Sequence, residues 1–580
     1  GGFQNNRQMG MHNNYRMVEN IFEELDVAGE WYYDRSQRIL YFYPPQNLDL
    51  DKALIEVPQH ESVFIFKGNV QNPVQYVEIS NIGIEHTLRT YTKTKEPLLR
   101  SDWTIYRGGT VVFEGAENCS ITGCSLVNLG GNAIFFSNYN RHCLVKNNHF
   151  TDTGASGVCF VGSPDAVRSP AFEYNEAVDW PDMDRQAGAI DNNYPMYCTV
   201  DNNLIHSIGQ VEKQVAGIQI SMSKSITVSH NSIYDTPRAG INISEGTWGG
   251  HLIEWNDVFD TVMETGDHGS FNSWGRDRFW HPQRQVMDSL TQKYLRLALL
   301  DAIETTVIRN NRWRCDHGWD IDLDDGSSNY HIYNNLCLNG GLKLREGFFR
   351  TVENNIIVNN SFHPHVWFNN SEDVFRHNIV TRNYYPVRIN VWGKEVDYNF
   401  FPDSVSLRRA QKNGTDKNSL SGDPLFVNPA TGDYRVSGNS PALQVGFKNF
   451  PMDSFGVQEP KLKAMARMPQ LPPYEPAEVE SEAVVHEWLG ATLKSLSTEG
   501  ERSATGMDAV RGILVVGVAA HSALKKVGIL PDDVILKCNS QNTDTWTDLN
   551  ARITALQSGD SVKLIVFSNQ RSRTVTFALP

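Results

Sequence analysis

The stretch Thr199-Val-Asp-Asn-Asn203 decides the fold, because close variants of it recur along the chain. Each variant is a short apolar strand that ends in asparagine. Successive final asparagines lie 20–28 residues apart, except for one step of 55 residues between Asn256 and Asn311. The final asparagines are residues 148, 175, 203, 231, 256, 311, 335, 355, 378 and 399.

Units of this length, with apolar residues at every second position, predict the coils of a right-handed parallel β-helix. An α-helical solenoid would need an apolar spacing of three or four. Asparagine tolerates left-handed backbone and can bond to its equivalent in the next coil. We therefore expect the asparagines to lie where strand meets turn and to stack along the solenoid.

A second family of strands follows a glycine in most coils, as in Gly217-Ile-Gln-Ile-Ser221. Apolar and polar residues alternate there, so one set points inward and the other outward. Alignment on the glycine predicts two outward columns, whose polar, charged and aromatic character is typical of a carbohydrate site. The first column is Gln219, Asn242, Asp320, Lys343, Trp367 and Arg388, and the second is Ser221, Ser244, Asp322, Arg345, Asn369 and Asn390.

The densest acidic segment, residues 316–325, supplies the candidate catalytic carboxylates. Asp320 and Asp322 would point outward about 7 Å apart. Glycosidases need about 5–5.5 Å for retention or about 6.5–9.5 Å for inversion, so this spacing leans toward inversion. Lys343 and Arg345, one coil further on, would hold such carboxylates ionised, and Asp324 would contact substrate. The alternative is a set of structural ion pairs between coils.

The 55-residue step is expected to leave the solenoid and form a wall of the cleft. In it, Asp267 is a further candidate catalytic residue, and His268, Trp274 and Arg276 are candidate substrate contacts. The alternative is an insertion packed on itself. Either Glu245 or Glu346 could be the second carboxylate. His365 is a candidate substrate contact. His363 and His365 could be ligands or a proton relay, and the alternative is a pair of surface histidines without a function.

Composition narrows the class of protein. With 40% hydrophobic and 21% charged residues, the 580-residue chain is expected to fold, and its net charge of −15 argues against nucleic acid as a partner. No apolar run is long enough to span a membrane. The eight cysteines lack metal or disulfide spacing and are expected to be buried thiols. The chain begins Gly-Gly within what resembles a coil, so we expect processing or missing upstream coils.

Five segments are predicted. They are an N-terminal β-rich cap over 1–70, the β-helix over 71–421, a C-terminal cap of the solenoid over 422–455, a stiff proline-rich linker over 456–483, and a module over 484–580. The last resembles a bacterial PDZ domain, in which Gly512-Ile-Leu-Val would form the carboxylate-binding loop and strand. A PDZ domain implies a peptide C-terminus as a possible partner. We expect this module to be an accessory on a tether, separate from the carbohydrate site.

Residues 15–450 resemble bacterial right-handed parallel β-helix proteins, and glycoside hydrolase family 141 is a similar named family. The resemblance implies a secreted or periplasmic enzyme that hydrolyses a glycosidic bond in a polysaccharide with two acidic residues and no cofactor. Two alternatives remain. One is a Ca²⁺-dependent lyase or epimerase with Lys343 or Arg345 as base. The other is a non-catalytic glycan-binding scaffold whose PDZ module recruits a partner.

Overall fold

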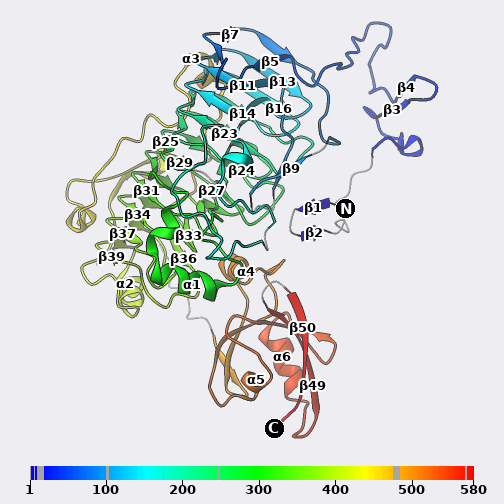
Figure 1. Ribbon diagram of the computed structural model, residues 1–580. Helices are drawn as coiled ribbons and strands as arrows, with labels where there is room; N and C mark the ends of the chain where they lie inside the picture. Colours follow the sequence, from blue (N-terminus) through cyan, green and yellow to red (C-terminus); the bar gives the residue numbers. More distant parts are fainter. Residues whose placement is uncertain are drawn as a thin grey trace.

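The computed structural model describes residues 2–4, 7–9, 19–93, 95–99, 103–173, 176–244, 248–474, 484–568 and 571–580. A right-handed parallel β-helix occupies most of the chain, and a small antiparallel module follows it (Figure 1). Each coil contributes one strand to each of three parallel sheets. Among these residues, no helix has the length and apolar character needed to cross a membrane.

Sheet 1 carries the glycine-marked strands, joined at its N-terminal end by the short β6 (Val74–Gln75) and β18 (Pro195–Met196). Its main strands are β5 (Phe64–Lys67), β11 (Val111–Glu117), β14 (Ile134–Arg141), β17 (Val158–Val161), β21 (Ala216–Ser221), β24 (Ala239–Ile243), β27 (Gly269–Ser273), β30 (Trp319–Leu323), β33 (Leu342–Arg345) and β36 (Phe362–His365).

Sheet 2 carries the asparagine-marked strands. They are β7 (Glu78–Ser80), β12 (Ser120–Thr122), β15 (Leu144–Lys146), β19 (Thr199–Asp201), β22 (Thr227–Ser229), β25 (Leu252–Glu254), β28 (Thr306–Arg309), β31 (Tyr330–Tyr333), β34 (Arg350–Glu353), β37 (Val374–Arg376) and β39 (Glu395–Asp397).

Sheet 3 follows each asparagine corner. Its strands are β8 (Gly83–Glu85), β13 (Ser125–Leu129), β16 (His149–Thr153), β20 (Leu204–His206), β23 (Ser232–Tyr234), β26 (Asp257–Val258), β29 (Arg312–Trp313), β32 (Leu336–Cys337), β35 (Ile356–Ile357), β38 (Ile379–Val380), β40 (Phe400–Phe401) and β41 (Leu420–Ser421).

The expected asparagine ladder is present at the corner between sheets 2 and 3. From Asn148 to Asn399, each ladder asparagine donates its backbone N–H and its Nδ2 to the Oδ1 of the next, except that the last lacks a further asparagine. The residue just before each ladder asparagine has left-handed backbone; Asn310, which precedes Asn311, has a φ of 54°. The ladder therefore provides hydrogen-bond acceptors for the buried backbone N–H groups at the corner, and the residue before each ladder asparagine makes the turn.

Two 55-residue steps interrupt the regular sequence spacing of the ladder asparagines, where the sequence predicted one such step. Asn148 bonds directly to Asn203, as Asn256 does to Asn311. The predicted strand ending at Asn175 is wrong, because β15 pairs with β19; Asn175 itself lies outside the described residues. Both excursions leave the coil between sheet 1 and sheet 2, after β17 and after β27.

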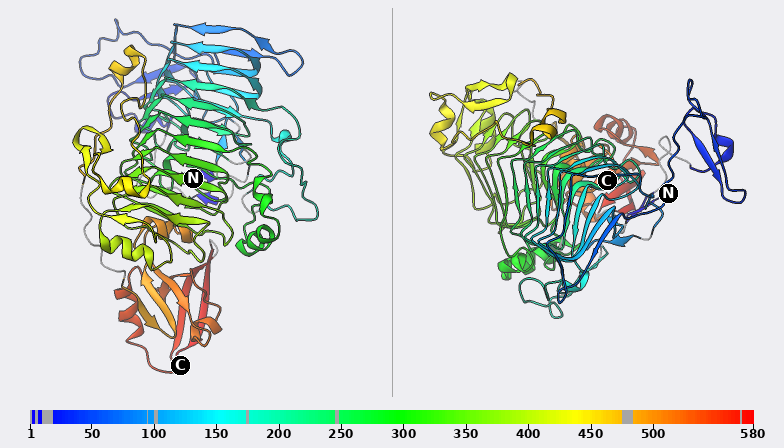
Figure 2. Two further views of the ribbon diagram at one scale, coloured as in Figure 1. Left: turned by 90° about the vertical axis from the view of Figure 1, so that its left-hand side faces the viewer. Right: turned by 90° about the horizontal axis from the view of Figure 1, so that it is seen from above.

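The second excursion begins later than predicted. Residues 269–273 form β27, a strand of sheet 1, so the segment 264–280 is only partly an insertion. The excursion proper carries helix α1 (Arg284–Lys293) and the 3₁₀ helix η3 (Leu295–Leu299). Its apolar residues pack with those of the first excursion in one cluster, and both lie on the same side of the solenoid (Figure 2).

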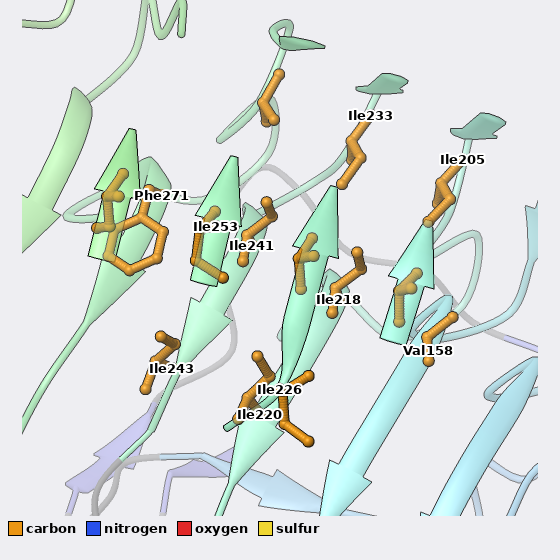
Figure 3. Packing of buried hydrophobic residues seen from close by; sticks show 14 of the residues in the cluster. Val158, Ile205, Ile218, Ile220, Ile226, Ile233, Ile241, Ile243, Ile253 and Phe271 are labelled. Carbon is orange, nitrogen blue, oxygen red and sulfur yellow. The ribbon is translucent and has the colours of Figure 1, made fainter. Parts of the chain in front are cut away.

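The interior of the cylinder is a continuous stack of aliphatic and aromatic side chains (Figure 3). Along sheet 1, the inward residues follow one another in register as Ile218, Ile241, Phe271, Ile321 and Leu342. All are fully buried, and each contributes about 1.5–3 kcal/mol of burial free energy. The eight cysteines all lie in the described part of the chain, where each is a buried free thiol, as expected.

The C-terminal segments differ from the prediction. Helix α2 (Ser404–Gln411) packs against the last coil through Leu407 and Ala410. The predicted cap, with hairpin β42 (Phe426–Asn428) and β43 (Asp433–Val436), instead covers the outer face of sheet 3. The linker region also docks there up to residue 474, since Val457 and Leu462 around α3 (Pro460–Met465) pack on Tyr234. At the other end, the hairpin of β3 (Trp31–Asp34) and β4 (Ile39–Phe42) precedes the first coil.

The C-terminal module is one sheet in the order β44, β45, β46, β47, β49 and β50, with three short helices. Its strands are β44 (His486–Trp488), β45 (Ala491–Ser495), β46 (Ile513–Val518), β47 (Val534–Cys538), β48 (Gln541–Asn542), β49 (Ser561–Ser568) and β50 (Arg571–Ala578); its helices are α4 (Glu499–Thr505), α5 (Ala523–Lys526) and α6 (Trp546–Ile553). Strand β46 pairs with β45 on one side and β47 on the other. The predicted peptide strand at Gly512–Val516 is therefore wrong, because strand addition needs a free edge.

Candidate functional site

The outer face of sheet 1 carries a column of polar and titratable side chains over its last four strands. Asn272 pairs with Asp322, Asp322 with Lys343, and Lys343 with His363. The predicted column set Asp320 beside Lys343 and is therefore shifted by one alternate position. The alignment on glycine failed because the glycine does not occupy the same position in every coil. Asp320 donates its backbone N–H to the carbonyl of Gly341, so Asp322, two residues later, is the one that pairs with Lys343.

Asp320 has a structural environment. Its carboxylate is fully buried and accepts four backbone N–H groups, from Cys315, Asn339, Gly340 and Gly341, at 2.7–3.1 Å. Burial raises the pKa of Asp320 to about 7, against the opposing effect of these donors. Oδ2 accepts three of these N–H groups and Oδ1 the fourth, and the side chain is closed to solvent, so Asp320 fastens two turns together and does not face a substrate.

Lys343 lies between two carboxylates on the outer face. Its Nζ is 2.9 Å from Asp322 Oδ1 and 3.1 Å from Asp324 Oδ1, and 4.0 Å from the centre of the Trp319 ring. Burial alone would lower the pKa of Lys343, but the two carboxylates outweigh it and raise it. Burial raises the pKa of Asp322 well above its usual range, although Lys343 opposes the shift. The ammonium is thus held protonated.

A second charged group adjoins the first. Arg345 Nε lies 2.7 Å from Asp325 Oδ1, 3.8 Å from Asp324 Oδ1 and 3.7 Å from Glu346 Oε2. Burial opposes ionisation of Asp324, but Lys343 and Arg345 outweigh it and lower its pKa. For Glu346 burial wins over Arg345 and raises the pKa to about 7. Two carboxyls beside one guanidinium therefore have opposite pKa shifts.

The separation of Asp324 and Glu346 is bounded by this shared neighbour. Their nearest oxygens cannot be farther apart than the sum of the two distances to Arg345 Nε. That limit covers the spacing of about 5–5.5 Å in retaining glycosidases and the lower part of the range of about 6.5–9.5 Å in inverting ones. Glycoside hydrolysis requires one ionised and one protonated carboxyl within this limit, and the opposite pKa shifts of Asp324 and Glu346 fit those two roles.

A cleft of about 1420 Å³ is lined by Trp319, whose ring contacts Lys343, while neither Asp324 nor Glu346 lines it. From the solenoid it is lined by Asp267, Trp319, His363 and Tyr385, and from the PDZ module by Arg502. A smaller hollow of about 580 Å³, lined by residues that include Arg284, Arg388 and Asp532, lies between the same two parts. The size of the larger cleft suits an extended ligand, and an aromatic ring with polar neighbours is a common lining for sugars.

The other predicted site residues are scattered. His268 and Trp274 are buried beneath Trp103, and Arg276 is buried in contact with Asp325 at 3.2 Å. Their expected role as exposed cleft contacts is wrong, because the loop that carries Trp103 covers that part of sheet 1. Glu245 lies outside the described residues.

Three further predicted residues lie in surroundings that differ from the expected open surface. Trp367 is wrong as a surface residue: it is fully buried in the core and donates its indole N–H to Leu344 O at 2.9 Å. Arg388 lies after the last strand of sheet 1 and contacts Asp532 of the PDZ module at 2.7 Å. His365 is fully buried in the column of Arg345.

Some residues of the cleft were missed. Trp319 stands within the acidic segment 316–325, but it alternates with Ile321, whose side chain lies in the core, so alternation alone predicts that Trp319 points inward. His363, which the sequence did single out with His365, lines the cleft. Arg502, 3.3 Å from Asp267, comes from the module expected to stand apart, and no feature of the sequence indicates this contact.

Comparisons with known proteins agree with the two folds. Residues 74–262 match the family model for a right handed beta helix region, and residues 488–579 match that for a PDZ domain. The chain thus contains a right-handed β-helix region and a PDZ domain. No curated protein matches the chain.

Three similar solved structures are β-helix neighbours of low identity. One is described as a glycoside hydrolase (16% identity, TM-score 0.40, 67% of this chain and 59% of that one). The others are a double mutant of the periplasmic alginate epimerase AlgG (10%, 0.29, 50% and 57%) and a complex of XylC with xylose (11%, 0.31, 63% and 56%). This chain spans less than two thirds of each, and such likenesses carry no argument about its reaction.

Proposed function

We propose that the protein is a glycoside hydrolase that cleaves a glycosidic bond in a polysaccharide or complex glycan on the outer face of sheet 1. One observation carries the proposal: Asp324 and Glu346 flank Arg345 with opposite pKa shifts. The cleft lined by Trp319 is linked to this pair through Lys343, which contacts both the Trp319 ring and Asp324.

In this mechanism Glu346 is the general acid and Asp324 the second carboxylate. Glu346 gives its proton to the glycosidic oxygen as the bond from that oxygen to C1 breaks. Asp324, kept ionised by Lys343 and Arg345, either attacks C1 or removes a proton from the water that does so. In the first case water then hydrolyses the glycosyl ester, and Glu346 takes the proton of that water. Asp322 pairs with Lys343, and Asp325 pairs with Arg345.

The lyase or epimerase alternative has weaker support. It needs a neutral base to remove the proton at C5, and Lys343 and Arg345 are instead paired with carboxylates. The acidic groups proposed to hold Ca²⁺ already surround the Lys343 ammonium. In the described residues, no group of three or more His, Cys, Asp or Glu side chains has the geometry to hold a metal ion.

The test is a panel of plant, algal and host glycans with mass analysis of the products. Asp324→Asn and Glu346→Gln are each expected to lower kcat/KM by about 10²–10⁴-fold on any glycan that is cleaved. Asp433→Asn is the matched control, because Asp433 pairs with Arg435 in the hairpin over sheet 3. Saturated products with a new reducing end support hydrolysis. Unsaturated products that absorb near the ultraviolet edge would support the lyase, and binding without turnover the scaffold.

The remaining expectations belong to the same proposal. A polymeric glycan is usually met outside the cytoplasm, so we expect the protein to be secreted or periplasmic. No cofactor is required by the mechanism. A peptide C-terminus remains a possible partner of the PDZ module, at an edge of its sheet, either β44 or β50.

A further inference from the structure

Helix α4 of the PDZ module rests on the last strand of sheet 1, next to the candidate carboxylates. Gly500 is buried there, and a Cβ at this position would lie 3.1 Å from Cε1 and Nε2 of His365. A glycine therefore permits the close approach of helix and imidazole. Two residues further on, Arg502 contacts Asp267 on the rim of the cleft. Figure 1 shows α4 between the solenoid and the rest of the module.

A second contact fastens the module to the solenoid. Arg388 Nε lies 2.7 Å from Asp532 Oδ2, and its NH1 donates to the carbonyl of Ala504, the residue near the end of α4, at 3.3 Å. Each of these two contacts contains an ion pair, and a hollow of about 580 Å³ lies between the module and the solenoid. Small polar interfaces between domains of one chain commonly permit relative motion.

The side chain of His365 is independent evidence that the docked position of the PDZ module is not its only position. Its side chain is fully buried, and neither ring nitrogen has a hydrogen-bond partner. An imidazole without partners in an apolar setting is costly, whereas one facing an open cleft can bond to water or to a sugar hydroxyl. Helix α4 covers the edge of the ring that carries Nε2.

We propose that the PDZ module is a movable wall of the carbohydrate cleft: with α4 docked, Gly500 covers His365 and Arg502 holds Asp267, and on undocking both side chains become available to a glycan. The nature of that ligand rests on the proposed function, but the motion does not. The module thus controls access to the last two strands of the site, and any peptide that binds the PDZ sheet can alter this access through it.

The test measures how fast diethylpyrocarbonate modifies His365 in the full-length protein, by mass spectrometry of the peptide that contains it. Gly500→Leu wedges the helix away from the ring, and the double variant Arg502→Ala, Asp532→Ala removes both ion pairs without adding bulk. Each is expected to raise the rate of modification of His365 several-fold. Arg552→Ala is the matched control, because Arg552 contacts only residues of its own module in the hydrogen bonds that the structure gives it.

An unchanged rate in the double variant would overturn the proposal, whatever Gly500→Leu does to the folding of the module. A rate in the wild type already equal to that of an exposed histidine such as His521 would also overturn it, since α4 would then not cover the ring. If a glycan substrate is found, Arg502→Ala should change KM more than kcat, and Arg502→Lys should restore part of the change. If none is cleaved, the proposed function fails while the modification rates still decide the motion.

Discussion

Glu346 sets the expected pH dependence of the reaction. Burial raises its pKa to about 7, so the general acid is protonated below this pH and loses its proton above it. The ionised partner, Asp324, has a lowered pKa and stays charged throughout this range. We therefore expect kcat/KM to fall about tenfold per pH unit above pH 7. A pH profile measured on a cleaved glycan checks this, and a flat profile up to pH 9 would remove Glu346 from the role of acid.

Asp320 is expected to matter for stability more than for chemistry. Asp320→Ala leaves four buried N–H groups without an acceptor, which should cost roughly 3 kcal/mol or more of unfolding free energy. Urea denaturation measures the loss. Asp316→Ala is the control, because Asp316 is partly exposed and pairs with Arg314. If Asp320→Ala proves as stable as this control, the backbone contacts of Asp320 contribute little.

At the level of residues, the sequence could predict where the chemistry lies but not which atoms face one another. The acidic segment and the cations Lys343 and Arg345 do meet on one face. Which aspartate faces Lys343 depends on the register between coils, and a glycine at the start of a strand does not fix it. Trp367 shows where prediction from alternation fails. By alternation it should point outward, but the chain turns after β36 and the ring points into the core.

Among the repeated elements, the asparagine ladder is expected to act as a cooperative unit. Asn311 accepts the backbone N–H and Nδ2 of Asn256 and donates Nδ2 to Asn335. Asn311→Ala removes these bonds and leaves a buried N–H on the neighbouring coil, at a cost of roughly 2–4 kcal/mol. Thermal unfolding followed by circular dichroism should show a lowered Tm. Exposed Asn439→Ala serves as control, and an equal Tm for the two variants would contradict the role of the ladder.

The ladder also explains why the coils could be predicted so well and the interruptions only in part. A buried asparagine at each corner is needed for packing, so its spacing reports the coils directly. The segment ending at Asn175 imitates this spacing by chance, in the middle of an excursion that the sequence divided into two ordinary steps. A strand of the β-helix needs a neighbouring strand in the coils before and after it, and the spacing of asparagines along the sequence does not reveal whether such a strand exists.

For the whole molecule, the two domains were predictable as units but their contact was not. Each has its own core, and local patterns suffice to recognise it. The position of the PDZ module depends on single pairs such as Arg388 with Asp532, between surfaces that look like any other solvated surface. The linker region likewise looked extended from its prolines, although its apolar residues Val457 and Leu462 fill a groove on sheet 3.

The wall formed by the two excursions should depend on one buried ion pair. Arg278 contacts Asp301 at 2.8 Å and also donates to the carbonyls of Asp184 and Gln186 in the first excursion. Arg278→Met leaves Asp301 as an unpaired buried charge, which costs about 3–5 kcal/mol. Because the hydrogen bonds of Arg278 all go to residues of the two excursions, we expect the loss to appear as local opening: rapid proteolysis within 176–193 and 281–300, with little change in the Tm of the β-helix. Arg296→Met, at an exposed position of the same excursion, should leave proteolysis unchanged. If Arg278→Met instead unfolds the solenoid as a whole, the excursions are integral to its stability rather than a separate wall.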